Sequence, residues 1–79
     1  MKLSIHSLKK TLFSGEAEKI IARTTSGEIT VLDDHIPLLS ALVDFPVRVV
    51  DARGNEVSVP VSGGFLEVRP GGEVVILCD

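Results

Sequence analysis

The residues best suited to binding a metal ion are three consecutive ones, Asp33, Asp34 and His35. Carboxylate and imidazole groups are common ligands of divalent metals. Consecutive residues on an extended chain point in different directions, however, and no second ligand motif accompanies this histidine. The pattern therefore favours a solvated loop over a metal site, and we expect no bound metal or cofactor.

A hydrolytic centre would need a nucleophile, a base and an acid that orients the base. Ser62, His35 and an aspartate supply these residue types, but the sequence lacks a Gly-x-Ser-x-Gly elbow. It also lacks the Gly-x-x-x-x-Gly-Lys-Ser/Thr loop that cradles nucleotide phosphates. The single cysteine, Cys78, fits an apolar filler near the end of a strand better than a reactive thiol. We therefore expect a protein that is not an enzyme.

Length and composition narrow the remaining possibilities. A chain of 79 residues has room for one core, so residues 1–79 are predicted to form a single domain. The net charge of −3, with scattered lysines and arginines and no Trp or Tyr, excludes a nucleic-acid-binding surface. The longest apolar run, Val74 to Cys78, is far shorter than a membrane-spanning helix, and residues 1–6 do not resemble a secretory signal. A cytoplasmic location is expected.

Closely spaced turn signals divide the chain into short segments with the alternation typical of β-strands. Segment 2–8 alternates apolar and polar residues, and the others are bounded by Gly, Pro, Asn or Asp. The segments predicted as strands are 2–8, 28–32, 47–51, 56–61, 65–68 and 73–78. Segment 38–43 supplies apolar mass and is expected to cross between two sheets. The strand from Glu73 to Cys78 is apolar on both faces, so we expect a partner or loops to cover its outer face.

Segment 16–23 is ambiguous because Ala17, Ile20 and Ile21 sit at helical spacing. Its Glu, Ala and Lys residues also favour a helix. The segment is only about two turns long, however, and it runs into the β-branched pair Thr24 and Thr25. We predict a strand.

Glycines mark two of the predicted turns. Gly54 and Asn55 lie between two valine-rich strands, where residues able to adopt positive φ are needed for a hairpin. Ser62, Gly63 and Gly64 are predicted to form a structural turn, because glycine tolerates tight bends and close approach of the backbone.

Five blocks in order carry a resemblance to a known family: Leu12 to Gly15, Glu18 to Ile20, Ser26 to Glu28, His35 to Leu39, and Ser62 to Val68. In this order and spacing they resemble the N-terminal β-sandwich of the epsilon subunit of F-type ATP synthase. The resemblance covers nearly the whole chain. It implies an all-β fold, a flattened antiparallel sandwich or barrel of about eight to ten short strands.

The resemblance also implies a function. The domain would be a non-catalytic part of the central stalk, or rotor, of ATP synthase, and its partners would be the gamma subunit and the polar loops of the c-ring. Glu28 and His35 match family positions at the end of the sandwich that faces the c-ring, so both are predicted to lie in that interface. The expected location is peripheral, on the cytoplasmic face of the bacterial inner membrane.

The sequence departs from the family in two respects. Asp33 and Asp34 stand where a pair such as Pro-Gly usually precedes the histidine, which changes the charge there. The chain stops at Asp79, without the family's C-terminal helical hairpin, so we expect the regulatory and ATP-binding activities of that hairpin to be missing. The alternative function is a stand-alone β-sandwich module that binds an unrelated protein.

Overall fold

The computed structural model describes residues 1–79 and contains nine β-strands and no helix. The strands are β1 (Lys2–His6), β2 (Thr11–Glu16), β3 (Lys19–Thr24), β4 (Gly27–Leu32), β5 (Leu38–Asp44), β6 (Val47–Val50), β7 (Glu56–Val59), β8 (Ser62–Arg69) and β9 (Glu73–Leu77). The all-β class and the strand number expected from the sequence are confirmed. The structure holds no helix long and apolar enough to cross a membrane.

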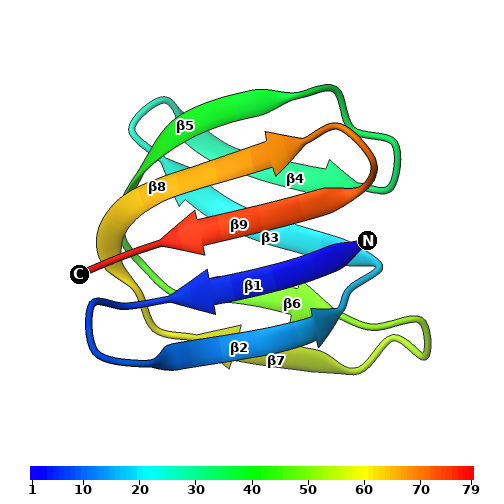
Figure 1. The fold of residues 1–79 in the computed structure, drawn as a ribbon, viewed down its shortest axis with the longest axis horizontal. Coiled ribbons are helices and arrows are strands. Elements are labelled where there is room, and N and C mark those ends of the chain that lie inside the picture. Colours follow the sequence, from blue (N-terminus) through cyan, green and yellow to red (C-terminus); the bar gives the residue numbers. More distant parts are fainter.

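The strands curl into two facing layers (Figure 1). One layer has the order β2-β1-β9-β8-β5, and the other has the order β4-β3-β6-β7. A single pair, Thr24 with Leu42, joins β3 to β5 and makes the two layers one continuous sheet. All neighbouring strands are antiparallel except β1 and β9, which run parallel at the centre of their layer. The first and last strands are therefore both fixed inside the sheet and are not at its edge.

The core lies between the layers and follows the period-two alternation of the strands. On β3, for example, Ile20, Ala22 and Thr24 are buried while Arg23 is exposed. Complete burial of a leucine or isoleucine contributes about 1.5–3 kcal/mol to folding. The large side chains with less than 2% exposure are Leu3, Ile5, Ile20, Val31, Val47, Leu66, Val74 and Ile76.

The ambiguous segment after Gly15 contains a strand, as predicted. β3 pairs with β4 along one edge and with β6 and β5 along the other, so its backbone groups are satisfied without a helix. Segment 38–43 differs from the expectation. It is a strand and not only a crossing between sheets, because β5 pairs with β8 from Leu38 to Asp44. β5 lies at the junction of the two layers, where its Leu42 pairs with Thr24 of β3.

The predicted hairpin forms between β6 and β7. Its loop is held by the Asp51 carboxylate, which accepts hydrogen bonds from the backbone N–H groups of Asn55 and Arg53 at 2.9 Å. The hydrogen bonds from Asn55, and then those from the other N–H groups of the loop, stabilise the charged carboxylate. They therefore hold the pKa of Asp51 below its ordinary value. Gly54 takes the positive φ that the turn requires, at 84°.

Ser62, Gly63 and Gly64 open strand β8, where the backbone bends within the strand. Gly63 and Gly64 have φ values of 91° and 109°. A Cβ atom added at Gly64 would lie 2.0 Å from the carbonyl oxygen of Leu77 on the neighbouring strand. Glycine is needed at position 64 because both its φ and its close approach to β9 exclude a side chain.

The connections gather at two opposite ends of the sandwich (Figure 1). The "Met1 end" comprises Met1 and the connections 17–18, 33–37, 51–55 and 70–72. The "Asp79 end" comprises the C-terminus and the connections 7–10, 25–26, 45–46 and 60–61. The strands run between these two ends, so the residues near each end form a separate surface.

Candidate functional site

Glu28 lies at the beginning of β4, at the Asp79 end of the sandwich. Its carboxylate is half-exposed and lies 3.8 Å from the guanidinium of Arg48 on β6. Arg48 also approaches Glu56, at 3.9 Å. Both ion pairs are exposed to solvent, so each contributes only about 0–1 kcal/mol to stability. The Glu28 carboxylate thus remains accessible to a partner.

His35 lies beyond the other end of β4, in the connection to β5 at the Met1 end. Its Nδ1 is 2.7 Å from the backbone oxygen of Ile36, an atom that can only accept a hydrogen bond, so Nδ1 is the donor. The imidazole is therefore turned back onto its own loop. Since the six-residue strand β4 separates them, Glu28 and His35 lie at opposite ends of the sandwich, and one flat contact cannot include both.

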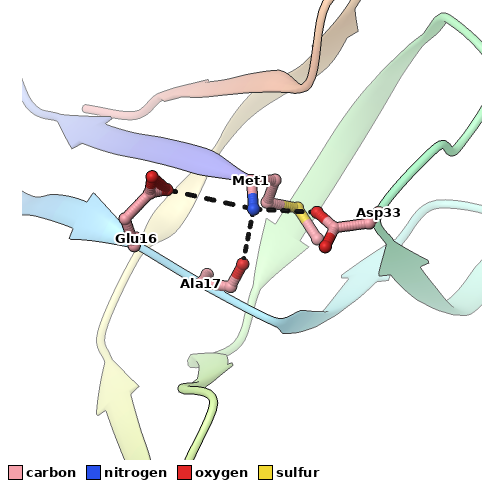
Figure 2. A network of polar contacts seen from close by, with 4 residues as sticks. All are labelled: Met1, Glu16, Ala17 and Asp33. Carbon is pink, nitrogen blue, oxygen red and sulfur yellow. Dashed lines mark hydrogen bonds and ion pairs between the residues drawn. The ribbon is translucent and has the colours of Figure 1, made fainter.

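The Asp33-Asp34-His35 cluster is split by the structure. Asp33 binds the α-ammonium of Met1 at 2.8 Å (Figure 2), and Asp34 takes a left-handed backbone conformation, with φ at 65°. No three His, Cys, Asp or Glu side chains converge as metal ligands would. Ser62 is at the Asp79 end, where its hydroxyl donates to the backbone oxygen of Asp79 at 3.3 Å. It therefore cannot form a hydrogen bond with His35 at the Met1 end.

The Asp79 end also presents residues that the sequence reading did not single out. Leu8 is 91% exposed at the tip of the β1–β2 turn, beside Lys9 and Lys10. The Ser7 hydroxyl holds this turn by accepting from the backbone N–H groups of Lys9 and Lys10, at 3.3 and 3.2 Å. A fixed turn of this kind offers a preformed contact surface close to one end of the sandwich.

Four apolar side chains lie near one another on the outer face of the β5-β8-β9 layer, beside the charged Glu67. We call this group the outer patch, and it comprises Leu39, Ala41, Phe65 and Leu77. Phe65 lies directly opposite Ala41 on β5 and Leu77 on β9, so the three side chains share one face. Leu39, Phe65 and Leu77 are 69%, 56% and 56% exposed. Exposed apolar side chains grouped in this way are typical of a surface that a partner covers.

The sequence contained a partial signal for the outer patch. The two-sided apolar pattern of the strand from Glu73 to Cys78 indicated a covered outer face, and Leu77 is part of that face. The contributions of Leu39 and Phe65 could not be foreseen, because they depend on which strands are neighbours. The contact between Met1 and Asp33 gave no sequence signal, since the two residues are far apart in the chain.

Comparison with known proteins places this geometry in a family. The family described as "ATP synthase, Delta/Epsilon chain, beta-sandwich domain" matches residues 1–79. The chain belongs to this family. The fold and the resemblance expected from the sequence are therefore confirmed over the whole chain.

Curated members of the family are similar to the chain. The ATP synthase epsilon chain of Brevibacillus brevis is 40% identical over 79 residues, which is 100% of this chain and 59% of that protein. The ATP synthase epsilon chain of Chromohalobacter salexigens is 48% identical over 66 residues, which is 84% of this chain and 47% of that protein. The chain thus spans about half the length of the curated relatives it matches.

Chains in solved ATP synthase structures share the fold. A chain in the structure of Euglena gracilis mitochondrial ATP synthase, OSCP/F1/c-ring, superposes with a TM-score of 0.89 at 27% identity, covering 96% of this chain and 48% of that chain. A chain in the central stalk/c-ring structure of Tetrahymena thermophila mitochondrial ATP synthase gives a TM-score of 0.81 over 99% of this chain and 62% of that one. Because the second chain is only 14% identical, this match shows a shared fold and nothing more.

Proposed function

We propose that the chain is a non-catalytic rotor component of an F-type ATP synthase. In this role it docks the gamma subunit through the outer patch and meets the polar loops of the c-ring through the Asp79 end. The observation that supports it best is the match of residues 1–79 to the delta/epsilon family, together with the likeness to a chain in a solved F1/c-ring assembly.

The outer patch fits the gamma contact. Stable interfaces have an apolar, well-packed centre in which aromatic residues are enriched. Phe65 lies at the centre of the outer patch, with Ala41 and Leu77 on the strands on either side. These three neighbouring strands are paired along their lengths, so the patch presents a stiff surface to a partner.

The Asp79 end fits the contact with polar ring loops. It carries the accessible Glu28 carboxylate, the Leu8 turn with its two lysines, and Arg23, whose guanidinium stacks 4.6 Å from the ring centre of Phe45. Charged groups at an interface set orientation and specificity more than affinity. We propose Glu28 as a ring contact. His35 lies at the other end and is not proposed for the same surface.

In this arrangement the chain clamps the foot of gamma to the ring, so that rotation of the ring turns the shaft without slipping. The protein reaches the cytoplasmic face of the bacterial inner membrane only through the complex. The chemistry of ATP synthesis is left to other subunits. What this chain supplies is stiffness, from a sheet whose first and last strands pair with each other.

Co-expression with the cognate gamma subunit tests the proposal. The two chains should elute together in size-exclusion chromatography, and Phe65→Asp should separate them, because a carboxylate in the centre of an apolar contact loses its hydration without a partner. Ser14→Asp, on the exposed edge strand β2, is the matched control and should leave co-elution intact. A folded chain that ignores gamma but retains an unrelated protein would support the stand-alone binding module instead.

A further inference from the structure

Strand β1 lies next to β9 and continues the surface that carries the outer patch (Figure 1). In the parallel β1–β9 pair, His6 is in register with Leu77. Leu77 is in register with Phe65 on β8, and Phe65 with Ala41 on β5. Because Ile5 is fully buried and successive side chains of a strand point to opposite faces, the His6 side chain lies on the outer face. One row of side chains therefore crosses four strands and ends at His6.

A partner that covers the outer patch must also reach His6. A stable interface covers about 800 Å² on each partner. Three strands about 4.8 Å apart form a strip only roughly 15 Å wide, so the contact must extend past β5 or past β9. At β5 the sheet turns into the other layer, where Thr24 pairs with Leu42. The outer face continues only across β9 onto β1, where His6 lies beside Leu77.

The half-buried imidazole of His6 has a single partner within the chain. Its Nδ1 lies 3.1 Å from the hydroxyl oxygen of Thr11, and no carboxylate lies within ion-pair distance of the ring. A hydroxyl both donates and accepts hydrogen bonds, so the Thr11 contact is compatible with a neutral and with a charged imidazole. A positive charge on this ring is therefore stabilised by water and not by an anion of the chain.

The charged groups around His6 do not replace that water. Those on the segments packed against it are Lys2 on β1, Lys9 and Lys10 in the β1–β2 turn, Glu16 on β2, Glu73 on β9 and Asp79 after β9. Glu16 and Glu73 lie in register with Lys2, at the other end of β1. Glu67, on the outer face of β8, pairs with Arg69 at 3.0 Å. The two lysines of the adjoining turn have the same sign of charge as an imidazolium.

We infer that His6 makes docking at the outer patch dependent on pH, with tight docking while the imidazole is neutral and weaker docking once it is protonated. The partner is the gamma subunit of the proposed function, on which this inference rests. Docking removes water from the ring, and the loss of hydration costs far more for a charged group than for a neutral one. An imidazole ordinarily titrates at about pH 6.5. Docking should therefore be at full strength above this pH and be lost progressively as the pH falls through it.

The test measures binding of the cognate gamma subunit to the 79-residue chain by isothermal titration calorimetry, between about pH 5.5 and pH 7.5. For the unchanged chain, the affinity should fall about five- to tenfold from the upper to the lower pH. Tenfold is the approximate limit for one group that titrates about one pH unit above the lower value. His6→Gln keeps a polar side chain that cannot be protonated. It should bind as tightly as the unchanged chain at pH 7.5 and lose most of the pH dependence.

His35→Gln is the matched control. His35 is the other histidine of the chain, and its imidazole is turned onto its own loop at the Met1 end. This variant should keep the pH dependence of the unchanged chain, and circular dichroism at both pH values checks that each variant is folded. NMR of the imidazole signals needs no substitution. Binding of gamma should keep the His6 ring neutral at a pH at which the ring of the free chain is protonated.

The outcomes separate this inference from the proposed function. An affinity that does not change with pH, or that changes equally in His6→Gln and in the unchanged chain, would overturn the role of His6 alone. Absence of any complex at pH 7.5 would contradict the docking of gamma at the outer patch, and the role of His6 with it.

Discussion

Gly64→Ala should destabilise the domain more than any other substitution considered for this chain. The new Cβ would lie 2.0 Å from the oxygen of Leu77 and 2.7 Å from the Cα of Cys78, both backbone atoms of the adjacent chain segment. Relief requires β8 to move away from the end of β9, next to the terminal pair Phe65 with Leu77. We expect a loss of about 4 kcal/mol or more, which is comparable with the whole stability of a domain of this size, about 4–12 kcal/mol. Urea denaturation with circular dichroism measures it.

Gly63→Ala is the matched control, because Gly63 has a similar φ of 91° but its added Cβ would approach only the oxygen of Leu42, at 3.5 Å. Only the cost of positive φ should appear, about 1–2 kcal/mol. That corresponds to a fall of roughly 5–15 °C in the melting temperature of a small domain. If both variants lost the same stability, close approach to β9 would not be the reason for glycine at position 64.

Glu28→Lys should weaken assembly with the c-ring by about tenfold or more, which corresponds to roughly 1.4 kcal/mol. The carboxylate is the acidic group we assign to the ring contact, and reversing its charge changes the electrostatic match that orients the interface. The isolated chain should remain folded, since the Glu28 pair with Arg48 is exposed. ATP-driven proton pumping by the reconstituted complex should fall as a result.

Glu56→Lys provides the control for this variant. Glu56 pairs with the same Arg48 at a similar distance, but it opens β7 next to the 51–55 loop of the Met1 end. It should cost the same small amount of stability and leave pumping unchanged. An unaltered pumping rate in Glu28→Lys, or an equal fall in both variants, would remove Glu28 from the proposed interface.

Local patterns predicted most of the strands. Alternation of apolar and polar residues near the start of the chain predicted β1. The valines on either side of Gly54 predicted the β6–β7 hairpin. In both cases the pattern indicates which side chains face the core. In β3, the helical spacing of Ala17, Ile20 and Ile21 was misleading. Pairing with strands on both edges outweighs helix propensity there, and the strand begins only at Lys19.

Strand β5 and the start of β8 were harder to predict. The segment from Leu38 to Asp44 looked like a connection because Pro37 and Pro46 flank it. Its role as a strand depends on β8, which comes some twenty residues later. Gly63 and Gly64 were predicted to form a turn between strands. Instead, β8 bends at these residues and pairs with β5 on both sides of Gly63, at Ser62 and at Gly64.

The candidate site followed from the sequence only in part. The family resemblance predicted that Glu28 and His35 lie in one interface. In the structure, strand β4 separates them, and six residues of strand span about 20 Å. The outer patch needed the strand order, which brings Phe65 between Ala41 and Leu77. The Met1 ion pair with Asp33 needed the full fold, because nothing in either residue's neighbourhood specifies the other.

The two proposed contact surfaces explain why one continuous sheet suits the task. The outer patch lies on the side of the sandwich and the Asp79 end lies on one of its tips, so force entering at one surface must pass through the sheet to reach the other. Pairing of β1 with β9 and of β3 with β5 joins the strands into one continuous sheet, in which only β2, β4 and β7 are edge strands. A flexible linker in the same place would let the ring turn without the shaft.

Restoration of coupled pumping tests the rotor function most directly. ATP synthase depleted of its epsilon chain is reconstituted with stripped membranes, and ATP-driven proton uptake is measured with and without the 79-residue chain. We expect the chain to restore uptake, and the Phe65→Asp chain to fail. Uptake that stays at the depleted level, although the added chain is folded, would contradict the proposed coupling of gamma to the c-ring.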